Sequence, residues 1–262
     1  MTAAPCPIVV AGAAGRMGQA VIAAIKAEPR AVLHAALEYE GHPRLGEDMG
    51  GVPLTSDALA AVLHAGAIID FTTTATTVAL SALAAQARVV HVIGTTGLTE
   101  VDQKKIVAAS RHAPIVQSGN YSLGIALLAK LVRQAAEVMG PSADIEIVEM
   151  HHRHKVDAPS GTALMLGEAA AAGLNRTLSD IRVPAREGHT GARPDGFIGF
   201  ASLRGGSVVG DHTVIFASEH ERIELIHKAE SRSMFARGAL AAALWGQGKA
   251  PGLYAMRDVL GD

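Results

Sequence analysis

The stretch PIVVAGAAGRMGQAVIAAIKA, which spans residues 7–27, decides the fold of this chain. Its first part, Pro7–Val10, is a short β-branched run that predicts a strand. A Gly-x-x-Gly-x-x-Gly turn at residues 12–18 follows, and Gln19–Ala27 has the composition of a helix. A strand, a glycine turn and a helix in this order are typical of the opening of a nucleotide-binding sheet, although this glycine spacing differs from the commoner Gly-x-Gly-x-x-Gly.

A second predicted strand supplies the acidic residue that a dinucleotide site needs. Ala31–Leu37 is apolar and ends at Glu38, which lies 20 positions after Gly18. An acidic side chain at about this distance hydrogen-bonds the ribose hydroxyls of a bound dinucleotide. We therefore predict dinucleotide binding; the alternative is a structural turn followed by a surface glutamate.

Three further apolar runs predict more strands, with helical stretches between them: Ala67–Phe71, Val89–Ile93 and Pro114–Gln117. Alternating strands and helices are typical of a parallel sheet, so this half of the chain is predicted to be α/β, Rossmann-like and doubly wound. Each of these strands ends in a loop of small polar residues: 72–74, 94–97 and 118–121. Because such loops share the carboxyl edge of the sheet, they are candidates to line the nicotinamide end of a dinucleotide.

The composition indicates a compact α/β protein. Of the 262 residues, 49% are hydrophobic, 18% are charged and only 3% are aromatic, so aliphatic side chains and alanine fill the interior. This length allows one large domain or two of ordinary size. A single cysteine, Cys6, excludes an intramolecular disulfide framework.

Charge and hydropathy narrow the class of function. The formal net charge is −2 and the sequence pI is near 6.6, without a basic stripe, which argues against a nucleic-acid binder. No apolar run reaches the roughly 20 residues that span a bilayer, and the N-terminus lacks the pattern of a secretory signal. We therefore expect a cytoplasmic protein that acts on small molecules and has neither a membrane nor a nucleic-acid partner.

In the second half of the chain the spacing of apolar residues changes from a helical pattern to alternation. A helix is predicted at Leu123–Met139, and apolar residues then alternate with polar ones from Asp144 to Glu149, which predicts a strand leading into His151. More short strands with turn signals between them are predicted at 197–203, 207–209, 212–217 and 222–228. Together they predict a mainly antiparallel sheet, arranged as a meander, in an α+β domain. Helices would cover one face of this sheet, which leaves the open face as a plausible oligomer interface.

The last helical stretch, Met234–Leu244, has no strand partner in this meander, so we predict that it returns to the first domain. The second domain is then an insertion into the first. The predicted division assigns residues 1–122 and 230–262 to a dinucleotide-binding domain. Residues 123–229 are assigned to a domain that binds substrate and forms the oligomer.

Residues 151–162, HHRHKVDAPSGT, concentrate proton donors just before a predicted helix, Ala163–Ala172, which Gly173 would stop. Gly161 and Thr162 could bind a carboxylate or phosphate through the N–H groups and dipole of the helix end, while the histidines and lysine transfer protons. One alternative is a solvated basic turn. Another is a zinc cluster, but no cysteine or carboxylate stands at a ligand-like spacing beside the histidines, so no metal is predicted.

These motifs resemble those of one family closely: dihydrodipicolinate reductase, also called 4-hydroxy-tetrahydrodipicolinate reductase. The resemblance covers nearly the full length and rests on five segments, at 12–18, 94–97, 151–162, 186–191 and 256–260. In that family a nicotinamide cofactor delivers hydride to a cyclic imine with two carboxylates, which gives tetrahydrodipicolinate in the diaminopimelate and lysine pathway. The resemblance also implies a homotetramer joined through the sheets of the substrate domains.

By position, the resemblance implies roles for five residues of the basic segment. It makes His151 a proton donor or acceptor and Lys155 a proton donor. It makes His152 a substrate contact and assigns a substrate carboxylate to Gly161 and Thr162. Proton donors are needed because hydride attack on a conjugated imine pushes electrons toward the ring nitrogen and an adjacent carbon, which a positioned acid must then protonate.

The resemblance also assigns the cofactor to three parts of the first domain. Glu38 contacts the ribose. The glycine turn binds the pyrophosphate and adenosine side through Gly12, Ala13, Ala14, Gly15, Arg16 and Met17. The nicotinamide side is lined by Gly94, Thr95, Thr96, Ser118, Gly119, Asn120 and Tyr121.

One residue departs from the pattern of the family. Members that accept the phosphorylated cofactor often carry a basic residue directly after the acidic one, whereas here Tyr39 follows Glu38. Recognition of the extra phosphate would then fall to Arg16 or to nothing. NADH is therefore favoured as the cofactor, and NADPH stays possible.

Two other functions are compatible with a similar first domain. One is a different NAD(P)-dependent reductase, such as an amino acid or semialdehyde dehydrogenase, because a fold alone does not fix function. No catalytic cysteine is evident for a semialdehyde dehydrogenase, since Cys6 precedes the first predicted strand. The other is a cofactor-sensing regulatory protein, which would have no need for a full set of histidines and lysine beside Gly161 and Thr162.

Overall fold

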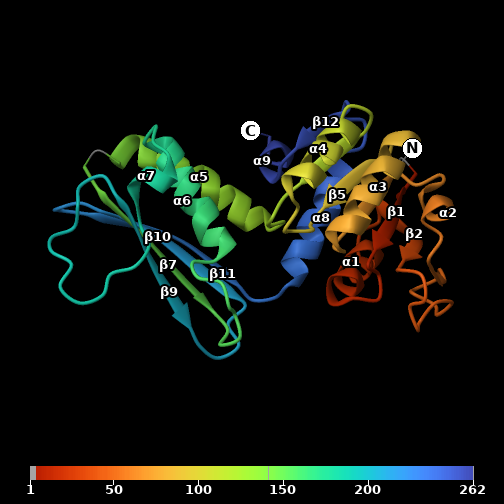
Figure 1. Cartoon of the computed structure of the whole chain (residues 1–262), viewed down its shortest axis with the longest axis horizontal. Coiled ribbons are helices and arrows are strands. Elements are labelled where there is room, and N and C mark those ends of the chain that lie inside the picture. Colours follow the sequence, from red (N-terminus) through yellow and green to blue (C-terminus); the bar gives the residue numbers. More distant parts are fainter. Residues whose placement is uncertain (1–3, 141, 262) are drawn as a thin grey trace. The chain divides into compact units, whose positions relative to one another are not determined.

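The structure, a computed structural model, describes residues 4–140 and 142–261, which fold into two compact units. The first unit comprises the residues up to Ser122 and those from Arg232 onward, and the second runs from Leu123 to Ser231. In Figure 1 the first unit therefore combines the red to yellow segments with the dark blue C-terminal segment.

The first unit is built on a sheet of seven strands in which all pairs of neighbours are parallel. The strands are β1 (Cys6–Ala11), β2 (Ala31–Leu37), β3 (Leu54–Thr55), β4 (Ala67–Asp70), β5 (Val90–Ile93), β6 (Pro114–Gln117) and β12 (Gly252–Tyr254). Their order is β12-β6-β5-β4-β1-β2-β3. The chain therefore builds outward from β1 in one direction and then restarts at β4 on its other side, and ligands bind at such a switch point.

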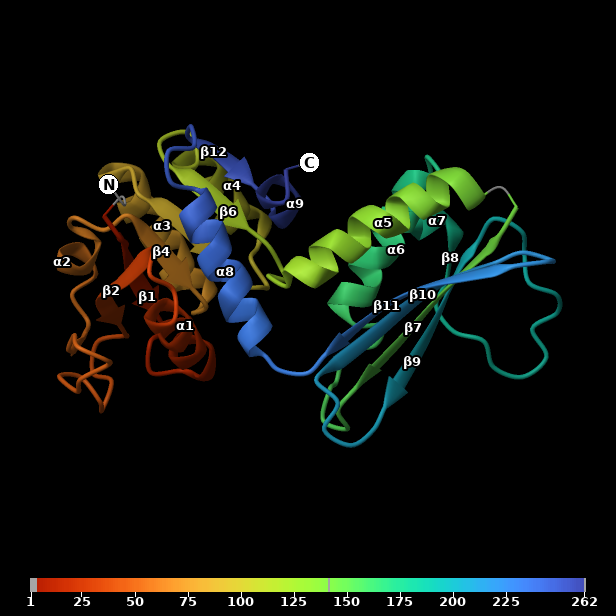
Figure 2. The same ribbon diagram turned by 180° about the vertical axis from the view of Figure 1, so that it is seen from behind.

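Helices cover both faces of this sheet. They are α1 (Arg16–Lys26), α2 (Ala58–Val62), α3 (Thr74–Ala87), α4 (Glu100–Ala109), α8 (Ser233–Trp245) and α9 (Met256–Val259). On one face α1 packs beside α8, which Figure 2 shows in front of the strands, and on the other face α3 packs beside α2 and α4. Because both faces are covered, β4 and β5 are buried along their whole length, which explains why they are apolar except for Asp70 and His91.

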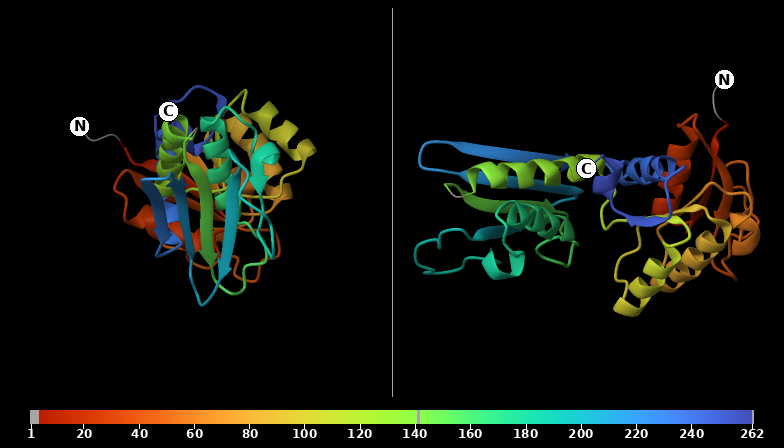
Figure 3. Two further views of the ribbon diagram at one scale, coloured as in Figure 1. Left: turned by 90° about the vertical axis from the view of Figure 1, so that its left-hand side faces the viewer. Right: turned by 90° about the horizontal axis from the view of Figure 1, so that it is seen from above.

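The second unit contains a five-stranded sheet in the order β11-β10-β7-β9-β8. Its strands are β7 (Asp144–His151), β8 (Arg182–Val183), β9 (Ile198–Arg204), β10 (Gly210–Ala217) and β11 (Arg222–Ala229). The left view of Figure 3 shows several of them side by side in blue, green and teal. β10 runs antiparallel to both of its neighbours, whereas β9 runs parallel to β7 and β8, so the sheet is mixed.

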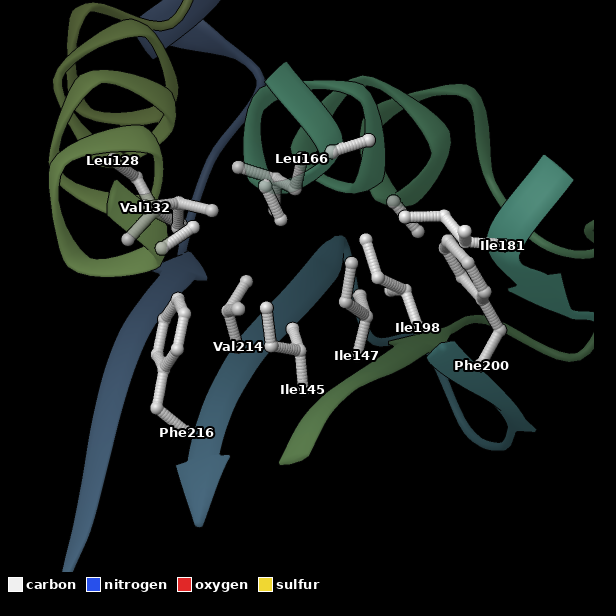
Figure 4. Close-up of a cluster of buried hydrophobic side chains, with 14 of the residues drawn as sticks. Leu128, Val132, Ile145, Ile147, Leu166, Ile181, Ile198, Phe200, Val214 and Phe216 are labelled. Atoms are coloured by element: carbon white, nitrogen blue, oxygen red, sulfur yellow. The ribbon is translucent and has the colours of Figure 1, made fainter. Parts of the chain in front are cut away.

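The helices α5 (Leu123–Met139), α6 (Gly161–Gly173) and α7 (Leu178–Ile181) pack on one face of this sheet. Figure 4 shows Leu128 and Val132 of α5 and Leu166 of α6 pointing toward the strand side chains, among them Ile145 and Val214. The period-two pattern of β7 produces this core, because every second residue from Ile145 onward is buried against the helices. The opposite face of the sheet carries no helix among the described residues of this unit.

The predicted fold class is confirmed, and several details of the prediction are corrected. The second sheet is not a meander, because β9 pairs in parallel with β7 instead of joining β10. Residues 207–209 form a turn and not a strand. The strands β3 and β12 were not predicted, since runs of two and three residues carry no readable period. Gly173 is the last residue of α6 and does not stop it, and Cys6 is the first residue of β1.

Candidate functional site

The glycine turn after β1 is held in a tight shape that requires its glycines. Gly12 has a φ of +72°, which L-residues with a side chain rarely adopt. The amides of Gly12 and Ala13 both donate to the carbonyl oxygen of Leu37, at 2.9 and 3.1 Å. At Gly18 a Cβ would lie 2.2 Å from the carbonyl oxygen of Gly12, so only glycine lets α1 approach the turn this closely.

The turn leads directly into a helix end that suits an anion. α1 begins at Arg16 after the N-cap residue Gly15, and no side chain among the described residues caps this end. The first N–H groups of the helix and its dipole therefore face outward from the turn, which is the arrangement that binds pyrophosphate in dinucleotide folds. Arg16 is exposed beside this end, and Met17 is half-buried.

Glu38 stands where the sequence predicts a ribose contact. The amide of Ala14 donates to its Oε1 at 3.1 Å, which ties the end of β2 to the glycine turn. Beside it lies a pocket of about 770 Å³ that runs from Gly12 past Tyr39 to the loop after β4. Its lining includes Glu38 and Glu40 but, among the described residues, no lysine or arginine. The described lining therefore offers carboxylate acceptors for hydroxyl groups.

The loops after β4 and β5 meet at the same edge of the sheet. A Cβ at Gly94 would lie 2.1 Å from the Phe71 ring, so glycine at this position allows the ring to pack over the start of the second loop. Thr95 is buried, and its hydroxyl oxygen lies 2.8 Å from that of Thr77 at the start of α3. Thr96, in contrast, is exposed to solvent.

The loop after β6 lies at the same edge of the sheet as the loops after β4 and β5. Ser118 donates its hydroxyl to the carbonyl oxygen of Asn120 at 2.7 Å, which folds the loop into a turn that leaves Gly119 exposed. Tyr121 is only 1% exposed, and its hydroxyl contacts the carbonyl oxygens of Ile93 and Val116, each at 2.8 Å. Its side chain is therefore packed in the core, and burial raises its pKa well above the usual value.

In the second unit His151 is the last residue of β7, and its ring is fixed from two sides. Its Nδ1 lies 2.6 Å from Oε2 of Glu149, which stands two residues earlier on the same face of the strand. The ring of His212 on β10 packs against it edge to face, with 5.1 Å between the ring centroids. Gly210 makes room for it, since a Cβ there would lie 2.9 Å from Nε2. Because Glu149 occupies Nδ1, Nε2 is the ring nitrogen left for chemistry.

Glu149 is a buried carboxylate with a full set of partners. Arg204, at the end of β9, holds both of its oxygens at 2.8 Å in a bidentate pair. The amide of Ser160 donates to Oε1 at 3.2 Å. Burial by itself raises the pKa of Glu149, but hydrogen bonds from Arg204, Ser202 and His151 outweigh it and lower that pKa to about 2. Glu149 is thus ionised at neutral pH and fixed in position.

The same carboxylate is linked to the N-terminal end of α6. Ser160 is the N-cap of this helix, and its hydroxyl oxygen accepts from the amide of Ala163 at 3.1 Å. Nε2 of His212 lies 3.0 Å from that hydroxyl. At Gly161, the first residue of the helix, a Cβ would meet nothing within 4 Å, so packing does not explain the glycine. The helix end thus opens onto free space, and Thr162 follows as its second residue.

Lys155 lies in the turn between His151 and α6. Its amide donates to the carbonyl oxygen of His152 at 3.1 Å, and its ammonium contacts both carboxylate oxygens of Asp157, at 2.7 and 2.8 Å. The hydrogen bonds from Lys155 lower the pKa of Asp157. His152 is half-buried and donates its amide to Val208, whereas His154 is exposed.

The structure thus gathers the predicted residues into two groups, one in each unit. The glycine turn, Glu38 and the loops at 94–96 and 118–120 lie along one edge of the first sheet. His151, Lys155 and the start of α6 follow β7 in the second.

Sequence analysis missed Glu149, Arg204 and His212. The period-two pattern of β7 places Glu149 on the face of His151 and was a usable signal, but the register that brings Arg204 and His212 alongside is a tertiary property.

Residues 4–140 and 142–261 contain no group of three or more His, Cys, Asp or Glu side chains placed to hold a metal ion. In the same part of the chain, no helix combines the length and the apolar character that crossing a membrane requires.

The first unit has a doubly wound parallel sheet, a glycine turn and an acidic residue at the ribose position. The second unit has proton donors beside a helix end. Together these features define a nicotinamide-dependent oxidoreductase. Two family models identify which one. The model described as dihydrodipicolinate reductase, N-terminus, matches residues 6–121, and the model described as dihydrodipicolinate reductase, C-terminus, matches residues 124–260. The chain belongs to the dihydrodipicolinate reductase family.

Individual relatives agree with the family models. The 4-hydroxy-tetrahydrodipicolinate reductase of Parvibaculum lavamentivorans is 62% identical over 97% of this chain and 97% of its own. That of Rhizobium rhizogenes is 59% identical over 97% of this chain and 96% of its own. Among solved structures, a dipicolinate-bound dihydrodipicolinate reductase from Paenisporosarcina sp. TG-14 has a TM-score of 0.81 with 24% identity, over 97% of this chain and 99% of that one. At this identity the structural likeness supports the fold.

Proposed function

We propose that this chain is a 4-hydroxy-tetrahydrodipicolinate reductase, which transfers hydride from a nicotinamide cofactor to a cyclic imine dicarboxylate. The observation that carries this proposal is the arrangement around Glu149, which ties the ring of His151 to the helix end at Ser160 in a member of this family. This arrangement disfavours a cofactor-sensing protein, because a sensor needs no fixed proton donor beside an anion-binding helix end.

The start of α6 binds a substrate carboxylate in this proposal. The N–H groups that begin at Gly161 and continue at Thr162 meet the carboxylate at the positive end of the helix dipole, and the open space at Gly161 leaves room for it. His152 makes a further contact. Lys155 is held by Asp157 in the free protein, so an incoming carboxylate competes with Asp157 for its ammonium group.

His151 and Lys155 supply protons in this proposal. Because Glu149 accepts at Nδ1, the ring of His151 is fixed with Nε2 as the atom that donates a proton to the reduced ring. The bidentate contact with Arg204 keeps Glu149 from turning away, so it also keeps the imidazole in place. Lys155 is a second donor on the same turn.

The first unit holds the cofactor, whose nicotinamide supplies the hydride when bound. The turn from Gly12 to Gly15, with Arg16 and Met17, holds the pyrophosphate, because its tight shape and the uncapped helix end fit a diphosphate. Glu38 accepts from the ribose hydroxyls. The nicotinamide side is lined by Gly94, Thr95, Thr96, Ser118, Gly119 and Asn120, with Tyr121 supporting the loop from the core.

NADH is the proposed cofactor in preference to NADPH. Glu38 and Glu40 line the adenosine pocket, and Tyr39 stands where a basic residue would meet a 2′-phosphate. A phosphate there would face carboxylates and no cation from the described lining. Arg16, exposed at the start of α1, is the nearest candidate for a compensating charge on the glycine turn.

We also propose that the protein is a cytoplasmic homotetramer joined through the open face of the second sheet. Leu203 of β9 and Ile226 of β11 lie on this face and are 49% and 52% exposed. On the same face, Met150 of β7 pairs with Leu203, and Val148 pairs with Thr213 of β10, which in turn pairs with Ile226. Exposed apolar side chains on a sheet face that no helix of its own unit covers are typical of a subunit interface.

The test is to follow nicotinamide absorbance while the purified protein meets substrate made in place from pyruvate and aspartate semialdehyde by its synthase. NADH and NADPH are compared in parallel reactions. Rapid oxidation of NADH is expected, with a lower kcat/KM for NADPH. If neither cofactor is oxidised although cofactor binding is demonstrated and a known reductase works under the same conditions, the proposed function is wrong.

A further inference from the structure

Asp70, the last residue of β4, is a fully buried carboxylate at the edge of the sheet that faces the cofactor in our proposal. A carboxylate with 0% exposure is costly in a protein core unless each oxygen has partners. Sequence analysis assigned it no role. Its partners come from the loop after β4, from α3 and from β5, all beside the switch point of the sheet. These contacts show which parts of the fold Asp70 holds in place.

The two carboxylate oxygens of Asp70 have different partners. Oδ1 accepts from the amide and the hydroxyl of Thr72, at 2.9 and 2.6 Å, which shapes the loop directly after β4. Oδ2 accepts from the hydroxyl of Thr77 on α3 at 2.7 Å and lies 3.3 Å from Nε2 of His91 on β5. Burial raises the pKa of Asp70, but the hydrogen bonds from His91, Thr72 and Thr77 together lower it below the usual value.

The hydroxyl of Thr77 connects Asp70 to Thr95. Thr77 has one hydroxyl proton, and the ionised carboxylate can only accept, so Thr77 donates to Asp70. The hydroxyl oxygen of Thr77 also lies 2.8 Å from that of Thr95. The Thr77 side chain thus links the carboxylate of Asp70 to the loop after β5, which Asp70 itself does not contact at Thr95.

His91 on β5, which is also 0% exposed, completes the network around Asp70. Its Nδ1 lies 3.2 Å from the hydroxyl of Ser81, whose proton is already given to the carbonyl oxygen of Thr77 at 2.8 Å. Nε2 of the same ring faces Oδ2 of Asp70, a carboxylate oxygen that only accepts. His91 therefore holds Oδ2 from the side of β5.

We propose that Asp70 is a positioning residue for the nicotinamide half of the cofactor, acting through Thr77 to fix Thr95 and the loop at 94–96. This inference rests on the proposed function, which assigns that loop to the nicotinamide side. A buried carboxylate that needs several polar partners is costly compared with apolar residues of the same volume, so stability alone does not explain it. Its contacts join the loops after β4 and β5 to the first turns of α3, where the ligand of a doubly wound sheet binds.

The test breaks the link at Thr77, which lies in the core and does not contact the cofactor in our proposal. Thr77→Val keeps the shape of the side chain and removes the hydroxyl, whereas Thr77→Ser keeps the hydroxyl and serves as the matched control. Binding is measured for NADH and for ADP-ribose, which has the adenosine, ribose and diphosphate but no nicotinamide. Thr77→Val should weaken NADH binding about tenfold and change ADP-ribose binding less than twofold, and Thr77→Ser should behave as wild type.

The outcomes of these binding measurements distinguish a failure of the role proposed for Asp70 from a failure of the proposed function. Unchanged NADH binding by folded Thr77→Val overturns the inference, as does an equal loss of NADH and ADP-ribose binding, which marks a general disturbance of the pocket. Wild-type protein that binds neither ligand overturns the proposed function instead. If Thr77→Val does not fold, Asp70→Asn tests the same link, because its amide nitrogen at the Oδ2 position cannot accept from Thr77. It is expected to weaken NADH binding as well, and unchanged binding would overturn the inference.

Discussion

Glu149 illustrates at the scale of one residue how a buried charge orders a site. It faces His151, Arg204 and the amide of Ser160 at once, so a single carboxylate fixes the proton donor and the loop that leads into α6. A buried carboxylate without these partners would be far more costly. Its partners come from three elements, which ties local order at the site to the folding of the whole second unit.

Glu149→Gln is expected to lower kcat about 100-fold and to leave NADH binding unchanged. The amide keeps the size of the side chain but cannot hold Nδ1 of His151 and Arg204 together as a carboxylate does, and a general acid that loses its orientation loses much of its 10²–10⁴-fold effect. Steady-state kinetics and a cofactor titration measure the two quantities. A variant with near wild-type kcat would show that Glu149 does not position His151.

The lowered pKa of His212 makes the free energy of unfolding depend on pH. Burial, and then the charge of the nearby His151, lower the pKa of His212 from 6.5 to about 4 in the folded protein. Between these values the unfolded chain binds the proton and the folded chain does not, so this part of the stability is present above pH 6.5 and is lost as the pH falls toward 4. Urea unfolding should show a loss of up to about 2 kcal/mol between pH 7 and pH 5 from this group.

His212→Gln is the comparison for that measurement. It should be less stable than wild type at pH 7, because Ser160 loses a partner, and its stability should depend less on pH between 7 and 5. Equal slopes in the two proteins would mean that His212 is not the group that titrates.

Tyr39→Arg is expected to shift cofactor preference toward NADPH. Tyr39 is 63% exposed at the rim of the adenosine pocket, so an arginine there can reach a 2′-phosphate without disturbing the core. The ratio of kcat/KM for NADPH to that for NADH should rise about tenfold, which corresponds to one charge-assisted contact. Tyr39→Phe is the control and should keep the wild-type ratio. An unchanged ratio in Tyr39→Arg would show that this position does not face the phosphate.

At the scale of the element, a substitution at the start of α6 should change ligand binding without disturbing the packing of the helix. Gly161 meets open space and has no positive φ, so the protein accommodates alanine at this position. Gly161→Ala should therefore keep or slightly raise the melting temperature, because glycine is a poor helix former. It should raise KM for the dicarboxylate about tenfold, because the methyl group enters the carboxylate's place. An unchanged KM would remove the start of α6 from the substrate site.

The elements also show where sequence patterns succeed. The bounds of β2, β6 and α5 agree with prediction to the residue, since each is a clear apolar run or a long amphipathic helix ended by turn residues. The expected strand at 207–209 is wrong because its apolar residues belong to the turn between β9 and β10. The expected meander is wrong because an apolar period reports burial of a face and carries no information about which strand lies alongside.

At the scale of the whole molecule, the open face of the second sheet predicts self-association. Ile226→Glu should turn the proposed tetramer into smaller species, because it places a charge at an exposed apolar position of the proposed interface. Analytical ultracentrifugation measures the mass. Val138→Glu, on α5 and 82% exposed, is the control and should leave the mass unchanged. A wild-type protein that sediments as a monomer would contradict the proposed assembly.

The sequence by itself determined the parallel first sheet, the glycine turn with Glu38, and the group from His151 to Thr162, because each depends on residues that are close along the chain. Only the tertiary structure decided the environment of these groups. Glu149 meets Arg204, and Asp70 meets His91, through the register of strands far apart in sequence, and Tyr121 turns into the core although its loop lies at the predicted edge. Local patterns record which face is buried, whereas partners across a sheet depend on how all the strands pack.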